Sequence, residues 1–433
     1  MTSERRDETP ITLRGARVVL PDRVAGRATV VVERGRVARV VEGETTAADE
    51  NARPGEGATP SEGAPRDYDL RGLTLYPGFI DVHVHGGVGV DALAASADDL
   101  ARVAAFLARR GVTSWLPTLV PAPDEDYRRA VASIEALIAR QRDEPERGDG
   151  DGDIGARALG VHYEGPYVNA AQCGALRTAY FRDNADRSPA ALDPLVRLTQ
   201  PLAPRAYPAH MITVAPEIAG GVDLVDTLVK NGWIVSIGHT RAEVGVLDSA
   251  RAAGARHMTH FFNAMSPLHH RDLGVVGWGL LRDDVTCDII ADCVHVSREA
   301  LRLALRVKTP ERLTLISDAV LPARKGDGDY QVWGETISVV GGRTRNARGS
   351  IAGSVITMLE AARTMRWLGC EPYEVARMAS LNPARLIGFD RELGSVEEGK
   401  RADLVALDDE GQARLTLVGG RVAHKWGLGV GVK

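Results

Sequence analysis

Two histidines spaced two residues apart, His83 and His85, are the first residues in this sequence whose types and spacing suggest chemistry. They follow an apolar run that starts after Pro77 and Gly78, a pattern typical of a turn and a short strand. Side chains alternate faces along a strand, so both imidazoles point the same way. Two neutral imidazoles on one face suit a divalent metal such as zinc. The pair therefore predicts metal ligands, and the alternative is a chance pair on a buried strand.

Three further residues could complete a metal site. Glu164, His239 and His260 each come directly after an apolar run. Glu164 is followed by Gly-Pro, which predicts a rigid turn at the end of a strand. A carboxylate and two imidazoles supply the three protein ligands of a catalytic zinc site that keeps one open position. Taken singly, the glutamate could belong to a surface turn and the histidines could be core or capping residues.

Asp318, His295 and Arg271 are the candidates for acting on a substrate. Asp318 follows an apolar run, and an aspartate beside a metal centre can take a proton from water and deliver it to a leaving amine. Its alternative role is a helix N-cap. His295 could contact the substrate or support a metal ligand. The guanidinium of Arg271 fits an anionic group, phosphate above all, although a lone loop arginine could equally be solvated.

The elements that must position these residues alternate between strands and helices. Strand-like runs lie around His83 and at 112–116, 157–162, 211–215, 234–237, 257–260, 285–290 and 313–316. Helical patterns lie at 98–110, 127–142, 223–231, 241–253, 298–306 and 354–368. About eight strands separated by helices predict an α/β fold, a (β/α)8 barrel of the TIM type, in which functional residues gather at the C-terminal strand ends.

The two ends of the chain have a different pattern. Residues 11–42 and 394–422 contain short alternating runs around turn residues, which predict antiparallel strands. We therefore expect a small flanking β-sandwich domain built from residues 1–75 and 388–433, and a barrel domain over 76–387. Two low-complexity inserts, 43–65 and 143–153, are predicted to be loops without a core of their own.

Composition excludes several classes of function. The 433 residues carry a formal net charge of -5, which gives no basic surface for nucleic acid or for a membrane. The four cysteines have no paired spacing, which argues against a disulfide framework. The first ten residues are polar, and no apolar run is long enough for a membrane helix. These features predict a cytoplasmic protein.

At these residues the chain resembles the amidohydrolase superfamily and, within it, the N-acetylglucosamine-6-phosphate deacetylases. The resemblance covers nearly the whole chain. The order and spacing of the matching motifs are more specific than any single motif. The matching stretches are 77–81 (PGFID), 164–166 (EGP), 238–240 (GHT), 259–265 (THFFNAM), 291–292 (AD) with His295, 317–319 (SDA), 382–384 (NPA) and 399–404 (GKRADL).

The resemblance implies roles for individual residues. Glu164, His239 and His260 would hold a metal, with Asp318 as the catalytic acid and base. The expected cofactor is zinc, with iron, manganese or cobalt as alternatives, and a second ion could bind because His83 and His85 are present. The implied substrate contacts are Ala175, Asn263, Ala264, Arg271, His295, Ile351, Ala352 and Gly353. Family members are commonly homodimers in which the phosphate-binding arginine crosses the interface.

One position departs from the family pattern. Leu176 stands where the family usually has a histidine that contacts the substrate near its acetamide. Leucine cannot donate a hydrogen bond, so a contact worth about 1–3 kcal/mol is missing or is replaced, for example by Arg177.

The main prediction is metal-dependent hydrolysis of N-acetylglucosamine 6-phosphate to glucosamine 6-phosphate and acetate. A related amidohydrolase acting on another N-acyl or cyclic amide is the first alternative, which Leu176 favours. A barrel that binds a ligand without catalysis is the second.

Overall fold

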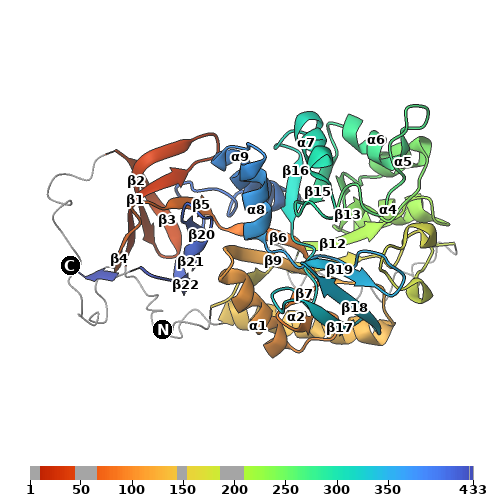
Figure 1. The fold of residues 1–433 in the computed structure, drawn as a ribbon, viewed down its shortest axis with the longest axis horizontal. Coiled ribbons are helices and arrows are strands. Elements are labelled where there is room, and N and C mark those ends of the chain that lie inside the picture. The colour runs from red at the N-terminus through yellow and green to blue at the C-terminus, as the bar shows by residue number, and fades with distance from the viewer. Residues whose placement is uncertain (1–9, 44–65, 144–153, 186–208, 429, 433) are drawn as a thin grey trace.

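The computed structural model describes residues 10–43, 66–143, 154–185, 209–428 and 430–432. A β-sheet stands at the left of Figure 1 and a barrel of strands and helices at the right. The inserts predicted at 43–65 and 143–153 lie outside the described residues, apart from residue 43 and the backbone of residue 143.

The flanking sheet is made from both ends of the chain. Its path runs β22-β21-β20-β5-β1-β2-β3, with β4 paired to both β1 and β23. These strands are β1 (Ile11–Val19), β2 (Val24–Glu33), β3 (Arg36–Glu42), β4 (Arg66–Asp69), β5 (Thr74–Pro77), β20 (Leu404–Leu407), β21 (Ala413–Val418), β22 (Arg421–Lys425) and β23 (Val430–Val432). Strand β5 crosses the predicted boundary between residues 75 and 76, and the domain limits stay a prediction.

A nearly closed barrel of parallel strands occupies the middle of the described chain. In spatial order its strands are β6 (Phe79–Val84), β9 (Val112–Leu119), β11 (Gly160–Glu164), β12 (Ala209–Val214), β13 (Ile234–Ile237), β14 (His257–Met258), β15 (Thr286–Ile290) and β16 (Leu313–Ile316). The short β10 (Arg157–Ala158) pairs with β9. The predicted (β/α)8 fold is confirmed.

The ends of β6 and the segment after β16 close the barrel. The backbone N–H of Asp318 donates to the carbonyl oxygen of His83 at 3.0 Å. The backbone N–H of His85 donates to the carbonyl oxygen of Ala319 at 2.8 Å. The carboxylate of Asp81 accepts the backbone N–H of Ser317 at 3.2 Å. Burial raises the pKa of Asp81 to about 7. These hydrogen bonds hold His83 and His85 beside Asp318.

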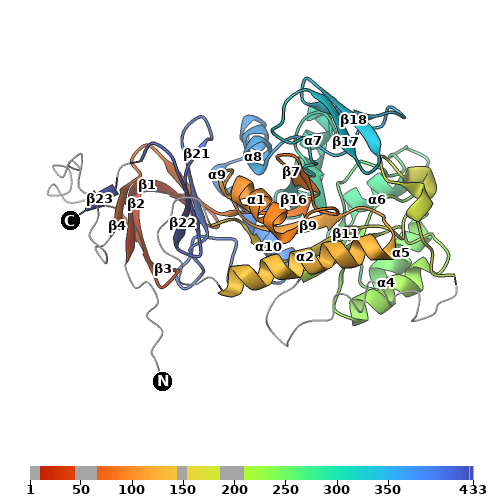
Figure 2. The same cartoon turned by 90° about the horizontal axis from the view of Figure 1, so that it is seen from below.

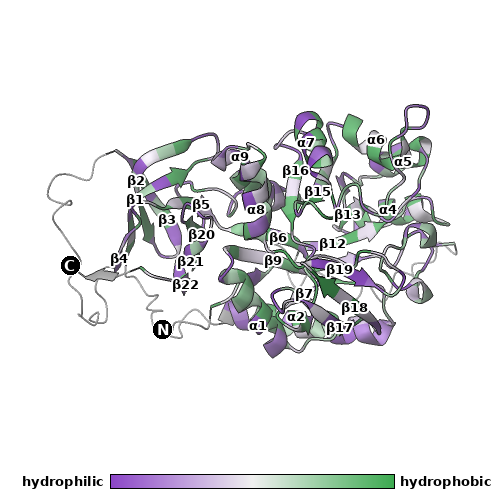
Figure 3. Ribbon diagram, viewed as in Figure 1, coloured by the Kyte–Doolittle hydropathy of each residue, from purple (hydrophilic) through white to green (hydrophobic). Residues whose placement is uncertain are grey.

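Helices cover the outside of the barrel. They are α1 (Ala97–Ala108), α2 (Asp124–Asp143), α4 (Gly221–Lys230), α5 (Val244–Ala252), α6 (Gly274–Leu281), α7 (Arg298–Val307), α8 (Met358–Trp367), α9 (Pro372–Ala376) and α10 (Asn382–Leu386), with a π-helical turn at Arg377–Leu381. Figure 2 shows α1 and α2 lying across one side. Purple and green residues alternate along α7 in Figure 3, because Leu301 and Ala304 face the core while its arginines face solvent. Among the helices of the described part, none is both long and apolar enough to cross a membrane.

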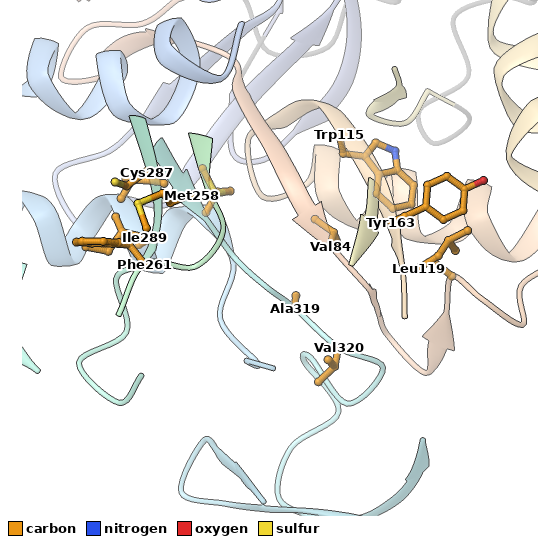
Figure 4. Close-up of a cluster of buried hydrophobic side chains, with 14 of the residues drawn as sticks. Val84, Trp115, Leu119, Tyr163, Met258, Phe261, Cys287, Ile289, Ala319 and Val320 are labelled. Carbon is orange, nitrogen blue, oxygen red and sulfur yellow. The ribbon is translucent and has the colours of Figure 1, made fainter. Parts of the chain in front are cut away.

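The main core lies between the strands and this helical layer. Figure 4 shows Trp115, Leu119 and Tyr163 packed on one side of the barrel, and Met258, Phe261, Cys287 and Ile289 on the other. A smaller cluster that includes Ile80, Met211 and Ile316 packs against Ala384 and Ile387. The flanking sheet has its own apolar cluster, contributed by strands from both chain ends. These cores hold the strand ends, and thus the polar residues on them, in place.

Two small elements were absent from the prediction. The hairpin β7 (Gly86–Gly87) and β8 (Val90–Asp91) follows His85 directly. A three-stranded antiparallel sheet is formed by β17 (Gly328–Val332), β18 (Glu335–Val340) and β19 (Arg343–Asn346), at the lower right of Figure 1. Its strands follow Asp318 in the chain. Both elements lie at the mouth of the barrel and contribute to the site.

Candidate metal centre and substrate pocket

Five buried side chains meet at the C-terminal ends of the strands. His83 lies on β6, Glu164 is the last residue of β11, and His85, His239 and His260 each follow the end of a strand by one or two residues. All five are almost completely buried. The strand ends thus bring together residues that are up to 177 positions apart in the sequence, from His83 to His260.

Two of these histidines and the nearby Asp318 have strained backbones. His239, His260 and Asp318 have φ angles of 48°, 32° and 50°. Residues other than glycine rarely occupy this left-handed region, and each such residue costs about 1–3 kcal/mol. The surrounding structure maintains these conformations because they turn the side chains inward from the strand ends. Strain of this kind concentrates at functional sites.

Glu164, His239 and His260 converge on one point. Glu164 Oε1 lies 3.0 Å from His239 Nε2 and 2.9 Å from His260 Nε2, and the two ring nitrogens lie 3.0 Å apart. The Nδ1–H of His239 donates to the carbonyl of Gln172 at 2.7 Å, so a neutral His239 turns the lone pair of Nε2 toward the carboxylate. Two acceptors at this distance repel each other unless a cation or proton lies between them. This donor set fits a divalent metal.

His83 and His85 form a second group with the same glutamate. Their Nε2 atoms lie 3.2 Å apart, and His85 Nε2 lies 3.2 Å from Glu164 Oε2. Asp318 Oδ1 lies 3.3 Å from His85 Nε2 and 3.5 Å from His83 Nε2. Glu164 therefore belongs to both groups of candidate metal ligands.

The charge state of Glu164 follows from its neighbours. Burial alone would raise the pKa of Glu164, but the surrounding imidazoles of His239, His260 and His85 lower it well below the ordinary value. The carboxylate is thus ionised in the pocket, as a metal ligand must be.

A layer of polar residues supports the ligands from inside the barrel. His162 donates from Nδ1 to the carbonyl of Val82 at 3.1 Å, and its Nε2 lies 3.0 Å from Thr213 Oγ1. Its ring meets that of His83 edge-on, with centroids 4.6 Å apart. Burial lowers the pKa of His162 to about 3, so this histidine is neutral. Its role is to hold the β6 backbone and the ring of His83.

Four of the five metal-ligand candidates, all except His83, line a pocket with a volume of about 230 Å³. The lining residues are His85, Glu164, Gly174, Ala175, Leu176, His239, His260, Asn263, Ala264, His295, Asp318, Trp333, Ser350, Ile351 and Gly353. Most of the substrate contacts that the resemblance implies are among them. No sequence pattern indicated that Trp333 and Ser350 would line the pocket.

Three residues considered from the sequence lie elsewhere. Ala352 is fully buried and does not line the pocket. Arg271 lies on an exposed loop and its guanidinium reaches His270 Nε2 at 2.8 Å, outside the pocket of this chain. Arg177 donates to the carbonyl of Pro121 at 3.1 Å and lies over the ring of Tyr180, so it does not stand in for the missing histidine at Leu176.

His295 is held from behind by Asp292. The Nδ1–H of His295 donates to Asp292 Oδ2 at 2.7 Å, and Asp292 Oδ1 accepts the backbone N–H groups of Val294 and His295, each at 2.8 Å. Burial alone would raise the pKa of Asp292, but these hydrogen bonds lower it. With Nδ1 engaged, His295 presents Nε2 to the pocket.

Comparison with known proteins places this site in a family. Residues 74–423 match the model of the amidohydrolase family. The chain belongs to this family. It is 38% identical over 344 residues to the N-acetylgalactosamine-6-phosphate deacetylase of Escherichia coli O157:H7, covering 79% of this chain and 85% of that protein. It is 34% identical to the N-acetylglucosamine-6-phosphate deacetylase of Bacillus subtilis (strain 168), covering 81% of this chain and 84% of that protein.

Solved structures agree with this placement. The crystal structure of N-acetylglucosamine-6-phosphate deacetylase from Pasteurella multocida superimposes with a TM-score of 0.81 and 29% identity, covering 95% of this chain and 99% of that one. The resemblance inferred from the motifs is therefore confirmed. Within the amidohydrolase family, this chain falls among the deacetylases of amino-sugar phosphates.

Proposed function

We propose that this chain removes the N-acetyl group of an amino-sugar 6-phosphate, with N-acetylglucosamine 6-phosphate as the first candidate substrate. The observation that carries the proposal is the convergence of Glu164, His239 and His260 beside Asp318 on the floor of an open pocket. A scaffold or a simple binding protein does not need buried imidazoles facing a buried carboxylate. Membership of the family and the names of the relatives support the same reaction.

Glu164, His239 and His260 would hold the metal, with zinc as the first candidate because imidazole and carboxylate ligands suit it. His83 and His85 would take a second ion with Glu164. A divalent metal at this site supplies Lewis acidity, which polarises an amide carbonyl and acidifies water.

Asp318 is the residue we assign to proton transfer. Its backbone is fixed by the bond from its N–H to the carbonyl of His83, and by the N–H of Ser354, which donates to the Asp318 carbonyl at 2.7 Å. The carboxylate thus points into the pocket next to His85. There it accepts a proton from the attacking water and returns it to the amide nitrogen as the C–N bond breaks. The products are acetate and a free amine.

Asn263, Ala264 and His295 would orient the sugar. The amide of Asn263 donates to the carbonyl of His260 at 3.1 Å, which keeps the side chain beside the metal ligands with its oxygen available. His295 adds the second polar group on that side. Hydroxyl groups of a sugar are the natural partners of such donors and acceptors.

Arg271 would bind the substrate phosphate of a neighbouring subunit in a homodimer. Its loop lies outside the pocket of its own chain and carries two exposed leucines, Leu268 at 50% and Leu273 at 40% of full exposure. Exposed apolar side chains around a cation are suited to an interface between subunits.

The hexose epimer is the main alternative within this chemistry. The 38% identity to the N-acetylgalactosamine-6-phosphate deacetylase favours N-acetylgalactosamine 6-phosphate as a second candidate substrate.

The four cysteines are all free thiols, which suits the reducing cytoplasm that we propose as the location of this reaction.

The test is acetate release by metal-loaded protein from N-acetylglucosamine 6-phosphate, N-acetylgalactosamine 6-phosphate and unphosphorylated N-acetylglucosamine. We expect rapid release from at least one phosphorylated sugar and slow release from the unphosphorylated one. Metal-loaded protein that releases acetate from none of the three would contradict the proposal and favour another amide substrate or a binding function.

A further inference from the structure

Trp333 occupies an unusual position in a tight turn. Val332 pairs with Glu335, so Trp333 and Gly334 alone connect β17 to β18. Their φ angles are 54° and 81°, which are those of a type I′ turn. This turn favours asparagine followed by glycine, and a bulky side chain in the left-handed region is an outlier. A tryptophan that departs from the turn rule points to a role for its side chain.

The indole of Trp333 is fixed against the metal-ligand side of the pocket. Its Nε1–H donates to Asp91 Oδ1 at 3.1 Å, and its ring meets that of His85 edge-on, with centroids 5.2 Å apart. Asp91 lies on β8, which pairs with the strand that follows His85. Trp333 is only 9% exposed although it sits at the tip of a hairpin. The side chain therefore forms a rigid wall.

Leu176 and Ile351 continue this wall. Both line the pocket together with Trp333. The segments that carry them are joined, because the guanidinium of Arg348 donates to the carbonyl of Ala175 at 3.1 Å. Ile351 follows β19, which pairs with β18 next to the turn of Trp333. Three apolar side chains from distant parts of the chain thus line the same pocket.

The polar residues lie across the mouth of the barrel. Asn263 follows β14, which stands three places from β6 around the nearly closed barrel, by way of β15 and β16. Trp333 contacts His85, the residue that directly follows β6. The lining of the pocket thus includes polar groups suited to sugar hydroxyls, such as Asn263 and His295, as well as the apolar side chains of Trp333, Leu176 and Ile351.

We propose that Trp333, with Leu176 and Ile351, receives the acyl group of the substrate and restricts it to acetyl. The inference rests on the proposed function, since it names the part of the pocket that takes the group being removed. A carbonyl held near Asp318, with its sugar at the polar groups of the pocket, directs the methyl group toward the apolar wall. A rigid wall at this position would disfavour longer acyl chains, and one additional methylene group changes kcat/KM by roughly 10–200-fold when a pocket discriminates against it.

The experiment compares kcat/KM for N-acetyl, N-propionyl and N-butyryl forms of the sugar phosphate that the protein hydrolyses. The variant Trp333→Asn removes the wall and suits the type I′ turn, so the hairpin should remain folded. We expect its butyryl-to-acetyl ratio to rise by roughly tenfold or more over the wild-type ratio. Trp333→Phe keeps the wall without the bond to Asp91 and should stay close to wild type in this ratio.

Two further variants separate selectivity from folding. Ile351→Ala, at a residue that is 37% exposed, should raise the same ratio to a smaller extent. Trp367→Ala removes an indole on α8 that is 62% exposed, and should leave the ratio unchanged.

Unchanged ratios in both Trp333→Asn and Ile351→Ala, with acetyl hydrolysis retained, would overturn the acyl-wall inference and leave the proposed function standing. A wild-type protein that hydrolyses none of the three acyl forms would instead contradict the proposed function, and the inference would fall with it.

Discussion

His239 and His260 direct their Nε2 atoms toward each other at a separation of 3.0 Å, and both approach the same oxygen of Glu164. The bond from His239 Nδ1–H to the carbonyl of Gln172 leaves its Nε2 without a proton when the ring is neutral. A cation is the simplest partner that satisfies all three atoms.

Loss of either histidine should remove the metal. We expect His239→Ala and His260→Ala to retain less zinc than the wild-type protein after dialysis, and to lose activity by roughly a hundredfold or more. Metal analysis of the purified proteins checks the first effect, and acetate release checks the second. His424→Ala, on β22 of the flanking sheet, is the matched control and should keep both properties. Full metal content in the two site variants would contradict the assignment.

Removal of the metal should destabilise the fold. A ligand that binds only the native state at roughly a thousandfold above its Kd adds about 4 kcal/mol to the free energy of unfolding. We therefore expect a chelator to lower the melting temperature of the wild-type protein. Glu164→Gln, which replaces the charged ligand shared by both histidine groups, should show a much smaller shift with the chelator. Equal shifts in the two proteins would show that the chelator acts elsewhere.

Asp318→Asn should separate catalysis from metal binding. Removing the group that transfers the proton should lower kcat by roughly 10²–10⁴-fold, because general acid and base catalysis contributes about that factor. The metal content should stay close to that of wild type, since Glu164, His239 and His260 are intact. Steady-state kinetics and metal analysis on the same sample give both values. Activity close to wild type would exclude Asp318 from proton transfer.

Arg271→Ala should affect only phosphorylated substrate. A charge-assisted hydrogen bond to phosphate contributes about 1.5–3 kcal/mol, so KM for the sugar phosphate should rise by roughly 10–100-fold. Turnover of the unphosphorylated sugar should not change. Arg302→Ala, an exposed position on α7, is the control. Because Arg271 lies outside the pocket of its own chain, a mixture of Arg271→Ala and Asp318→Asn subunits should regain some activity if the arginine acts across a dimer.

Asp292 should make stability depend on pH at the acid end. Its pKa is lower in the folded protein than usual, so its ionised form stabilises the fold above the unfolded pKa of about 4. That contribution is lost as the pH falls through the lower folded value. Asp292→Asn should therefore cost about 1–3 kcal/mol near pH 7, and the difference from wild type should shrink below about pH 4. Urea unfolding of both proteins across this pH range measures the difference in their free energies of unfolding. A difference that grew toward acid pH would contradict the prediction.

Local patterns predicted much of the barrel and the positions of its functional residues. The apolar runs before Glu164, His239, His260 and Asp318 indicated strands, and each of these residues does end or follow a strand of the barrel. This succeeded because a buried parallel strand is marked by a continuous apolar run, and the polar residue after it marks the strand end. The helix α6 was missed because its residues are almost all apolar, so the sequence lacks the separate polar and apolar faces that mark an amphipathic helix.

Contacts between distant segments could not be predicted in the same way. The sheet β17–β19 and its turn at Trp333 have no periodic signal that relates them to His85, and yet the two rings are in contact. Arg177 stands next to Leu176 in the sequence, but its guanidinium bonds to Pro121 instead of entering the pocket. Adjacency in the sequence therefore does not predict which side chains meet in the pocket, because a loop can direct neighbouring side chains to different places.

The sequence by itself determined the kind of protein: an amidohydrolase barrel with ligands for a divalent metal and an aspartate beside them. Residue type, strand ends and motif order are local properties, and they are sufficient for that conclusion. Only the tertiary structure decided which residues line the pocket, with Trp333, Leu176 and Ile351 among them and Arg271 outside it. The physical reason is that a wall is made by packing between segments far apart in the chain, and packing leaves no periodicity in the sequence.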